Sequence, residues 1–136
     1  MATILLIEDN QANTKLARLL LGTVGHTVLC AADAETGLTM ARAEHPDLVL
    51  MDIQLPGMDG LAATALLKAD ADTAAIPIIA LTALAMKNDQ EKSMLAGCDA
   101  YIAKPLRRQE LFATIDRLLL KAEQARGLAR RGRDRK

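Results

Sequence analysis

Carboxylate side chains follow two separate apolar runs of the sequence. Glu8 and Asp9 come directly after residues 4–7, and Asp52 comes directly after residues 48–51. If these runs are neighbouring strands, three carboxylates meet at one edge of a sheet and raise one another's pKa values unless a cation lies between them. Mg²⁺ prefers oxygen ligands, retains water and pairs with phosphate, so it fits such a site. The pattern indicates a magnesium site in which Asp52 could be a nucleophile toward a phosphoryl group.

Two more polar side chains stand after later apolar runs. Thr82 follows residues 76–81, and Lys104 follows residues 100–103. A hydroxyl and an ammonium at the same edge would contact the equatorial oxygens of a phosphoryl group, whose transfer depends on positioning and charge neutralisation. Considered alone, Asp52 fits equally well a carboxylate that only caps the following loop. The elements that carry these residues decide between the two interpretations.

The apolar runs have the pattern of strands that are buried on both faces. Residues 48–51, for example, are four apolar residues in succession without polar alternation, and the turn residues Pro56 and Gly57 follow soon after. We expect strands over residues 4–7, 26–30, 48–52, 76–81 and 100–103, and helices over residues 11–21, 34–43, 60–69, 86–96 and 107–125. Asn10 or Asp9 can cap the first helix. Its buried face should be formed by Ala12, Leu16, Leu19 and Leu20.

Five strands that alternate with five helices predict an α/β fold of the doubly wound class. Such a fold has a parallel sheet, right-handed crossovers and helices on both faces. We take the strand order 2-1-3-4-5, in which strand 1 lies beside strand 3. Glu8, Asp9 and Asp52 then converge at the carboxyl ends of the central strands, where ligands collect in open parallel sheets.

Length and composition predict a single domain. The chain has 136 residues, of which 51% are hydrophobic and 25% are charged, as in ordinary globular proteins. No apolar run approaches the roughly 18–20 residues that span a bilayer, and the first residues lack a signal-peptide pattern, so we expect a cytoplasmic protein. We expect reduced thiols at Cys30 and Cys98, and loop or strand-edge residues instead of metal ligands at His26 and His45.

The charge is unevenly distributed along the chain. The formal net charge is zero, but residues 126–136 hold six Lys or Arg residues and one Asp, a net charge of +5 that leaves −5 on residues 1–125. We expect a domain over residues 1–125 and a flexible basic tail over residues 126–136, which Gly127 and Gly132 interrupt. The basic run permits contact with nucleic acid, but without interleaved aromatic residues we do not expect it.

Several short motifs occur in order at the predicted strand ends. They are Glu8-Asp9-Asn10, Asp52-Ile53-Gln54-Leu55-Pro56-Gly57-Met58-Asp59-Gly60, Thr82-Ala83 and Lys104-Pro105. In this order and spacing they resemble the receiver domain of two-component response regulators over residues 3–122. Single-domain regulators of the DivK type are the group that the sequence looks most like. The resemblance implies the CheY-like fold, which is also the fold of flavodoxin.

The resemblance implies a role for each candidate residue. Asp52 would accept a phosphoryl group from a histidine kinase or a histidine phosphotransfer protein, and the only catalysis would be the protein's own phosphorylation and slow dephosphorylation. Output would come from docking of a partner, or of a second copy as a homodimer, on the face formed by residues 86–125. The other roles would be Mg²⁺ binding by Glu8, Asp9, Asp52 and the Gln54 carbonyl, phosphoryl binding by Lys104, and switching by Thr82 and Tyr101.

Two further features follow from the same resemblance. The residues two positions after the phosphorylated Asp and two positions after the switch Thr govern hydrolysis in this family, and here they are Gln54 and Leu84. Leu84 cannot orient water, so we expect a phosphorylated state that lasts for minutes or longer. The peptide bond before Pro105 should be cis.

Other function classes fit the residues less well. A phosphohydrolase with an aspartyl-phosphate intermediate would want a second carboxylate two residues after the nucleophile, where this chain has Gln54. A flavin carrier would need a loop that cradles phosphate after the first strand, but Glu8 and Asp9 repel an anion. From the residues alone, Tyr101 could also be an ordinary half-buried aromatic of a strand.

Overall fold

The computed structural model describes residues 2–82, 94 and 96–134, with side chains described as far as residue 125. The strands are β1 (Thr3–Ile7), β2 (Thr27–Ala31), β3 (Leu48–Asp52), β4 (Ile78–Thr82) and β5 (Ala100–Ala103). The helices are α1 (Gln11–Thr23), α2 (Ala34–Glu44), α3 (Gly60–Ala69) and α5 (Arg108–Asp134). The helix expected over residues 86–96 lies almost wholly outside the described residues.

The five strands form one parallel sheet in the order β2-β1-β3-β4-β5, which confirms the predicted order. β1 lies beside β3 with Ile7 opposite Met51. β4 lies beside β5 with Thr82 opposite Ala103. These registers bring the carboxyl ends of the four strands to the same edge of the sheet, where the predicted site residues follow them.

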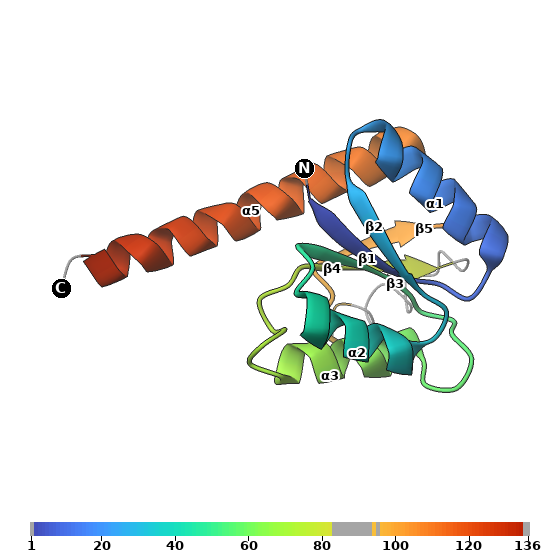
Figure 1. Cartoon of the computed structure of the whole chain (residues 1–136), viewed down its shortest axis with the longest axis horizontal. Helices are drawn as coiled ribbons and strands as arrows, with labels where there is room; N and C mark the ends of the chain where they lie inside the picture. The colour runs from blue at the N-terminus through green and yellow to red at the C-terminus, as the bar shows by residue number, and fades with distance from the viewer. Residues whose placement is uncertain (1, 83–93, 95, 135–136) are drawn as a thin grey trace.

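Helices cover both faces of the sheet. Figure 1 shows α1 and α5 on one face and α2 and α3 on the other. Alternate residues of β1 point into the two cores: Leu6 packs with α1 and α5, whereas Ile7 packs with α2 and α3. Both faces of β1 and β3 therefore need apolar side chains, which explains the continuous apolar runs in their sequences.

Side-chain caps begin α1, α2 and α3, which start at this edge of the sheet. The Asn10 carboxamide oxygen accepts a hydrogen bond from the Asn13 backbone N–H at 3.0 Å, so Asn10 caps α1. Asp33 caps α2 and Asp59 caps α3 in the same way. An Asx residue three positions before an unpaired N–H is the ordinary signal for a helix start.

The buried face of α1 differs from the predicted one. Its buried residues are Ala17 and Leu21, while Leu16 and Leu19 are 39% and 69% exposed. Leucines stand at 16, 19, 20 and 21, so apolar residues lie on several sides of this helix and the spacing does not define one face. The position of the helix over β1 and β2 decides which side is covered.

The last helix is longer than predicted. α5 runs from Arg108 to Asp134 and includes most of the range expected to be a flexible tail. Figure 1 shows its first part packed along the sheet and its last part extending past the body of the molecule. Gly127 and Gly132 cost about 1 kcal/mol each in a helix interior, but they do not end this helix.

The cysteines and histidines take the positions of structural residues. Cys98 is buried and Cys30 half-buried, and both are free thiols. His26 accepts a hydrogen bond from the Ala2 backbone N–H at its Nδ1, and His45 ends α2 in a left-handed conformation with φ of 46°. In the part of the chain that the structure describes, no helix is long and apolar enough to cross a membrane.

Candidate functional site

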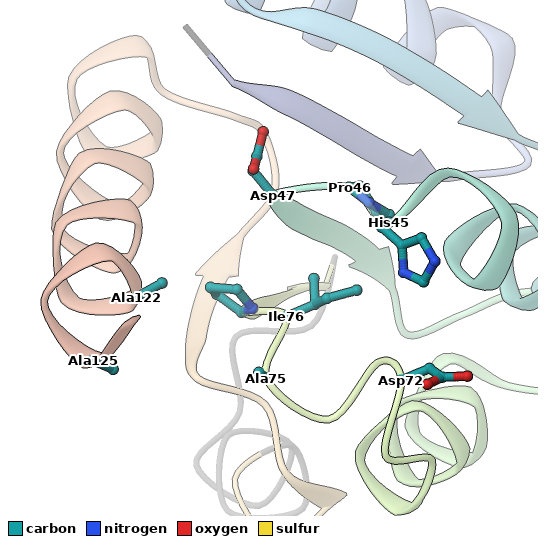
Figure 2. Close-up of a pocket in the computed structure, with 9 residues that line it drawn as sticks. His45, Pro46, Asp47, Asp72, Ala75, Ile76, Ala122 and Ala125 are labelled. Carbon is teal, nitrogen blue, oxygen red and sulfur yellow. The ribbon is translucent and has the colours of Figure 1, made fainter. Parts of the chain in front are cut away.

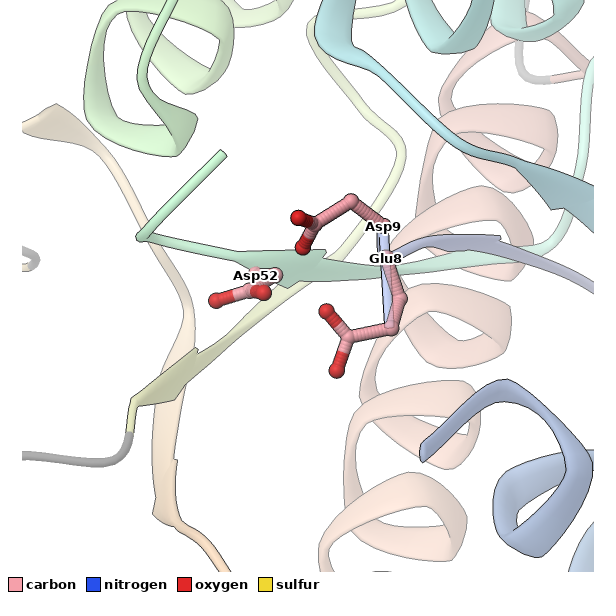
Figure 3. Close-up of side chains that lie close together, drawn as sticks. All are labelled: Glu8, Asp9 and Asp52. Carbon is pink, nitrogen blue, oxygen red and sulfur yellow. The ribbon is translucent and has the colours of Figure 1, made fainter. Parts of the chain in front are cut away.

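The pairing of β1 with β3 brings the predicted carboxylates together. Glu8 and Asp9 follow the last residue of β1, and Asp52 is the last residue of β3. Figure 3 shows the three side chains lying close together at this edge, and one oxygen of each lies within 4.8 Å of the others. Glu8 and Asp52 are only 4% and 3% exposed, whereas Asp9 is open to solvent. A buried pair of acids with one exposed acid beside it can hold a metal ion.

Lys104 reaches this cluster from the end of β5. Its Nζ donates to Glu8 Oε1 at 2.7 Å and lies 3.1 Å from Asp52 Oδ2. The side chain is 16% exposed, so water screens these ion pairs only weakly. The Lys104–Pro105 peptide is cis, as the family resemblance predicts. Lys104 therefore stands where the sequence analysis placed it.

A single ammonium, that of Lys104, faces the two buried acids, and the pKa values of these acids shift in opposite directions. Burial and the neighbouring Glu8 raise the pKa of Asp52 to about 7, against smaller lowering effects of the Gln54 backbone N–H and Lys104. Burial would also raise the pKa of Glu8, but its contacts with Asp52, Lys104 and Asn13 outweigh that effect and lower it. Burial disfavours the charged Lys104, yet Glu8 and Asp52 raise its pKa. A further positive charge beside the two acids would therefore stabilise their ionised forms.

Glu8 has one oxygen without a donor. Its Oε2 is buried and has no hydrogen-bond partner among the described residues. Beside it lies a cavity of about 30 Å³, lined in part by Asn13 and Lys104. That volume is enough for one water molecule, which needs polar partners of this kind. The sequence alone does not single out Asn13, because nothing in its local pattern distinguishes it from any polar residue in the first turn of a helix.

Gly60 allows α3 to begin directly against Asp52. A Cβ at this position would overlap the Asp52 carbonyl oxygen and lie 2.8 Å from Ile53 Cα. The Gly60 backbone N–H donates to the Ile53 carbonyl at 3.0 Å. A glycine is therefore required where the backbone after β3 approaches the helix so closely. Its position directly after the capping residue Asp59 was visible in the sequence, but the close approach was not.

The remaining predicted residues lie around the cluster. Gln54 is exposed, and its backbone N–H donates to Asp52 Oδ1 at 3.0 Å. Thr82 is the last residue of β4 and is 1% exposed. Tyr101 lies half-buried in β5 and packs against the core shared with α2 and α3. Ala83 and Leu84 lie outside the described residues, as does most of the expected output helix.

The geometry suits a hard cation followed by a phosphoryl group. The three acidic side chains offer only oxygen ligands, and two of them, Glu8 and Asp52, are too buried to be solvated by water. Lys104 Nζ lies 3.1 Å from Asp52 Oδ2, and the carboxylates of Glu8 and Asp9 lie close to the same side chain, so a phosphoryl group on Asp52 would be within reach of the Lys104 ammonium and of a cation held by the acids. The same fold carries its ligands at the carboxyl ends of the strands that form this edge.

The fold and the acidic edge define a class of protein, and the family comparison agrees. The model of the response regulator receiver domain matches residues 4–116, so the chain belongs to this family. The chain is also 43% identical over 113 residues to the polar-differentiation response regulator DivK of Brucella ovis, across 83% of this chain and 92% of that protein. DivK of Brucella anthropi is 42% identical over the same shares.

Solved structures give the same result. The receiver domain of the sensor histidine kinase PA1611 from Pseudomonas aeruginosa, with a magnesium ion coordinated in its active site cleft, is 37% identical, with a TM-score of 0.81 over 87% of this chain and 97% of that one. A CheY-like receiver domain protein from Methanospirillum hungatei is 31% identical, with a TM-score of 0.83 over 92% of this chain and 98% of that one.

Proposed function

We propose that this protein is a single-domain response regulator that accepts a phosphoryl group on Asp52 and signals through phosphorylation-dependent contacts with other proteins. The observation that carries the proposal is the position of Asp52, buried at the end of a central strand with two other carboxylates and Lys104 around it. Family membership and the likeness to DivK support it. Residues 1–125 would form the receiver domain, with a cytoplasmic location, where kinases of this class present their phosphohistidine.

Three carboxylates would hold the metal ion. Glu8, Asp9 and Asp52 would supply side-chain oxygens, and the Gln54 carbonyl would supply a fourth oxygen from the loop after β3. Bound Mg²⁺ would neutralise the acidic cluster and orient the phosphoryl oxygens. The raised pKa of Asp52 supports this, because Asp52 must lose its proton before it can act as a nucleophile.

The transfer step requires a phosphohistidine in line with Asp52. An Asp52 carboxylate oxygen forms the new P–O bond while the P–N bond breaks, and the electron pair returns to the imidazole nitrogen of the donor. Lys104 is close enough to Asp52, at 3.1 Å, to contact an equatorial oxygen of the phosphoryl group. The donor would be a histidine kinase or a histidine phosphotransfer protein.

Thr82 and Tyr101 would convert phosphorylation into a change of surface. Thr82 lies at the end of β4, next to β3 and its Asp52, and is buried. Its hydroxyl would move toward the phosphoryl group, and the Tyr101 ring would turn into the space that this movement vacates. The change would appear on the face formed by residues 86–125, where a partner or a second copy would dock.

Labelling with acetyl phosphate tests the acceptor and the metal together. We expect one phosphoryl group per chain by intact mass, and none after Asp52→Ala or in the presence of a chelator. Asp9→Asn should leave the acceptor in place while weakening labelling at low Mg²⁺ concentration, because it removes the exposed ligand. Labelling that persists in Asp52→Ala, or that ignores the chelator, would refute the proposal.

The phosphorylated state should last for minutes or longer. Gln54 and Leu84 occupy the two positions that control water access in this family, and Leu84 has no group that could orient a water molecule. Time-resolved intact mass after removal of the phosphodonor measures the decay, with Mg²⁺ present. Leu84→Glu should shorten the lifetime, since a carboxylate can hold the attacking water. Decay within seconds in the original protein would contradict the expectation.

A further inference from the structure

A second concave site lies at the opposite edge of the sheet from Asp52. It is a pocket of about 410 Å³ that we call the basal pocket, and Figure 2 shows it between α5 and the two loops that precede β3 and β4. α5 contributes Ala122 and Ala125, and the loops contribute Asp47, Asp72, Ile76 and Pro77, among others. Its walls are largely apolar, with carboxylates at the rim.

The acids of the basal pocket lack cationic partners. Asp47 and Asp72 form no salt bridge with any residue in the described part of the chain. Their acidic neighbour Asp70, by contrast, is paired with Arg42 at 3.1 Å. Asp47 is half-buried and accepts a hydrogen bond from the Thr3 backbone N–H, whereas Asp72 is exposed. The rim therefore offers unneutralised negative charge beside an apolar hollow.

The same sequence contains a basic segment that could pair with the acids of the basal pocket. Residues 126–136 carry a net charge of +5 and begin directly after Ala125, at the wall of the basal pocket. We call residues 126–134 the arm, since α5 continues through them as one helix to Asp134. At about 1.5 Å per residue the helix carries this charge steadily away from its own pocket. Figure 1 shows the arm extending past the body of the molecule.

We propose that two copies of this chain associate through the arm and the basal pocket. The arm of each copy lies over the basal pocket of the other, with the two α5 helices antiparallel. Ala122 and Ala125 allow close approach because their side chains are small. This contact is self-complementary, as two-fold interfaces require, since each copy supplies one arm and one pocket.

Charge selects this arrangement over the alternatives. A parallel pair would place two basic arms side by side, and their like charges repel across the interface. The antiparallel pair instead places each arm, which carries a net charge of +3 over residues 126–134, against a body that carries −5 over residues 1–125. One arm over one pocket in each direction is a small contact for a stable dimer, so the association should be reversible. It should also weaken as salt screens the charges.

The basal pocket is remote from the phosphorylation site, although Ala122 and Ala125 belong to the face of residues 86–125 proposed for signalling output. The basal pocket lies at the amino-terminal edge of the sheet, whereas Asp52 lies at the carboxyl edge. The association should therefore be independent of phosphorylation and of Mg²⁺. It should also survive substitutions on the exposed side of the same helix, such as at Asp116.

Sedimentation velocity of the full chain over a range of concentrations tests the proposal. We expect a monomer–dimer equilibrium at low salt whose dissociation constant rises by about tenfold or more on Asp72→Arg or Ala125→Arg. The control Asp116→Arg makes the same charge change as Asp72→Arg on the exposed face of α5 and should have no effect. Circular dichroism confirms that each variant is folded.

A charge swap tests whether the contact runs between copies. One variant carries Asp72→Arg, and the other carries Arg130→Glu, Arg131→Glu and Arg133→Glu. Each should be monomeric alone, but an equal mixture should form a heterodimer, because both arm–pocket contacts then pair opposite charges. A monomeric original protein at all concentrations, or a mixture that stays monomeric, would overturn the proposal. Loss of association in Asp116→Arg alone would do the same.

Discussion

The chemistry of Asp52 depends on its burial and on the charged side chains that the fold places beside it. As the last residue of a strand buried on both faces it has almost no contact with water, and it shares its ammonium partner, Lys104, with Glu8. A single positive charge divided between two buried carboxylates leaves one of them inclined to keep a proton. The same imbalance makes the cluster receptive to a cation.

The metal-free protein should lose stability as the pH rises toward neutral because of this residue. The pKa of Asp52 is about 7 in the folded state and near 3.8 when the chain is unfolded. The folded state therefore binds the proton more tightly, and its stabilising effect is complete below about pH 4 and is lost as the pH rises through 7. We expect Asp52→Asn to exceed the original protein in free energy of unfolding by about 1–3 kcal/mol at pH 8 in chelator.

Urea unfolding at pH 5 and pH 8 measures this difference. The gap between Asp52→Asn and the original protein should be smaller at pH 5, since Asp52 then carries its proton. Addition of Mg²⁺ at pH 8 should also reduce this difference, because Mg²⁺ stabilises the protein with a carboxylate at position 52 more than it stabilises Asp52→Asn. Parallel pH profiles for the two proteins would show that Asp52 does not titrate in this range.

At the scale of elements, the close contact between the start of α3 and the end of β3 can be tested by a substitution at Gly60. Gly60→Ala would drive a Cβ into the Asp52 carbonyl, a backbone atom that cannot move without moving the site. We expect a loss of at least about 2 kcal/mol in the free energy of unfolding, together with weaker Mg²⁺ binding. Chemical denaturation and metal titration measure the two effects.

Gly22→Ala is the matched control for that substitution. Gly22 is in α1, and a Cβ there meets nothing within 4 Å. The same change should therefore stabilise the protein by about 0.5–1 kcal/mol, because alanine has the higher helix propensity. Equal effects of the two substitutions would mean that helix propensity, and not the contact with Asp52, dominates at Gly60.

Lys68 holds together the segments that enter β4 and β5. Its Nζ donates to the carbonyls of Ala74 and Ile76 at 3.2 and 2.9 Å and to Asp99 at 2.9 Å, and Asp99 in turn accepts from the Ile78 backbone N–H. Lys68→Met should lower the free energy of unfolding by about 1–3 kcal/mol, because it leaves polar groups without partners. Thermal and urea unfolding measure this loss.

Arg42→Met provides the comparison for Lys68. It breaks the Arg42–Asp70 ion pair, whose side chains are 51% and 30% exposed. An exposed pair of this kind contributes little, so the change should stay within about 1 kcal/mol. If Arg42→Met costs as much as Lys68→Met, the hydrogen bonds to the loop carbonyls are not what makes Lys68 important.

The sequence predicted some elements well and others poorly for identifiable reasons. β3 and α3 were predicted with their observed bounds, because an uninterrupted apolar run ends at Asp52 and a capping Asp59 precedes the helix. The end of α5 was missed because Gly127 was given too much weight as a helix breaker. Local patterns mark where chains start and turn, whereas helix length and buried faces depend on contacts elsewhere.

The same distinction applies to the site. Glu8, Asp9, Asp52 and Lys104 were predictable because each stands at the end of an apolar run, and parallel topology brings such ends together. Asn13 and Gly60 were not, since their importance comes from a cavity beside Glu8 and from a backbone approach to Asp52. These are tertiary distances that no spacing in the sequence encodes.

At the scale of the whole molecule, the two edges of the sheet have different chemistry. The carboxyl edge concentrates buried acids around Asp52, and the amino-terminal edge has the basal pocket beside the basic arm. The central strands separate them, so a ligand at one edge does not touch the other. Association and phosphorylation can therefore be measured independently in the same preparation.

The pairing of β1 with β3 also has a consequence for the order in which the chain folds. Glu8 and Asp52 are separated in sequence by α1, β2 and α2, so their carboxylates meet only after a long loop has closed. An unfolded chain has no site, and a cation that binds only the folded chain stabilises it by mass action. Saturating Mg²⁺ should accordingly slow unfolding in stopped-flow denaturant jumps more than it speeds refolding, and Asp52→Asn should weaken the effect. An equal acceleration of refolding would mean that the acidic edge is already assembled in the transition state.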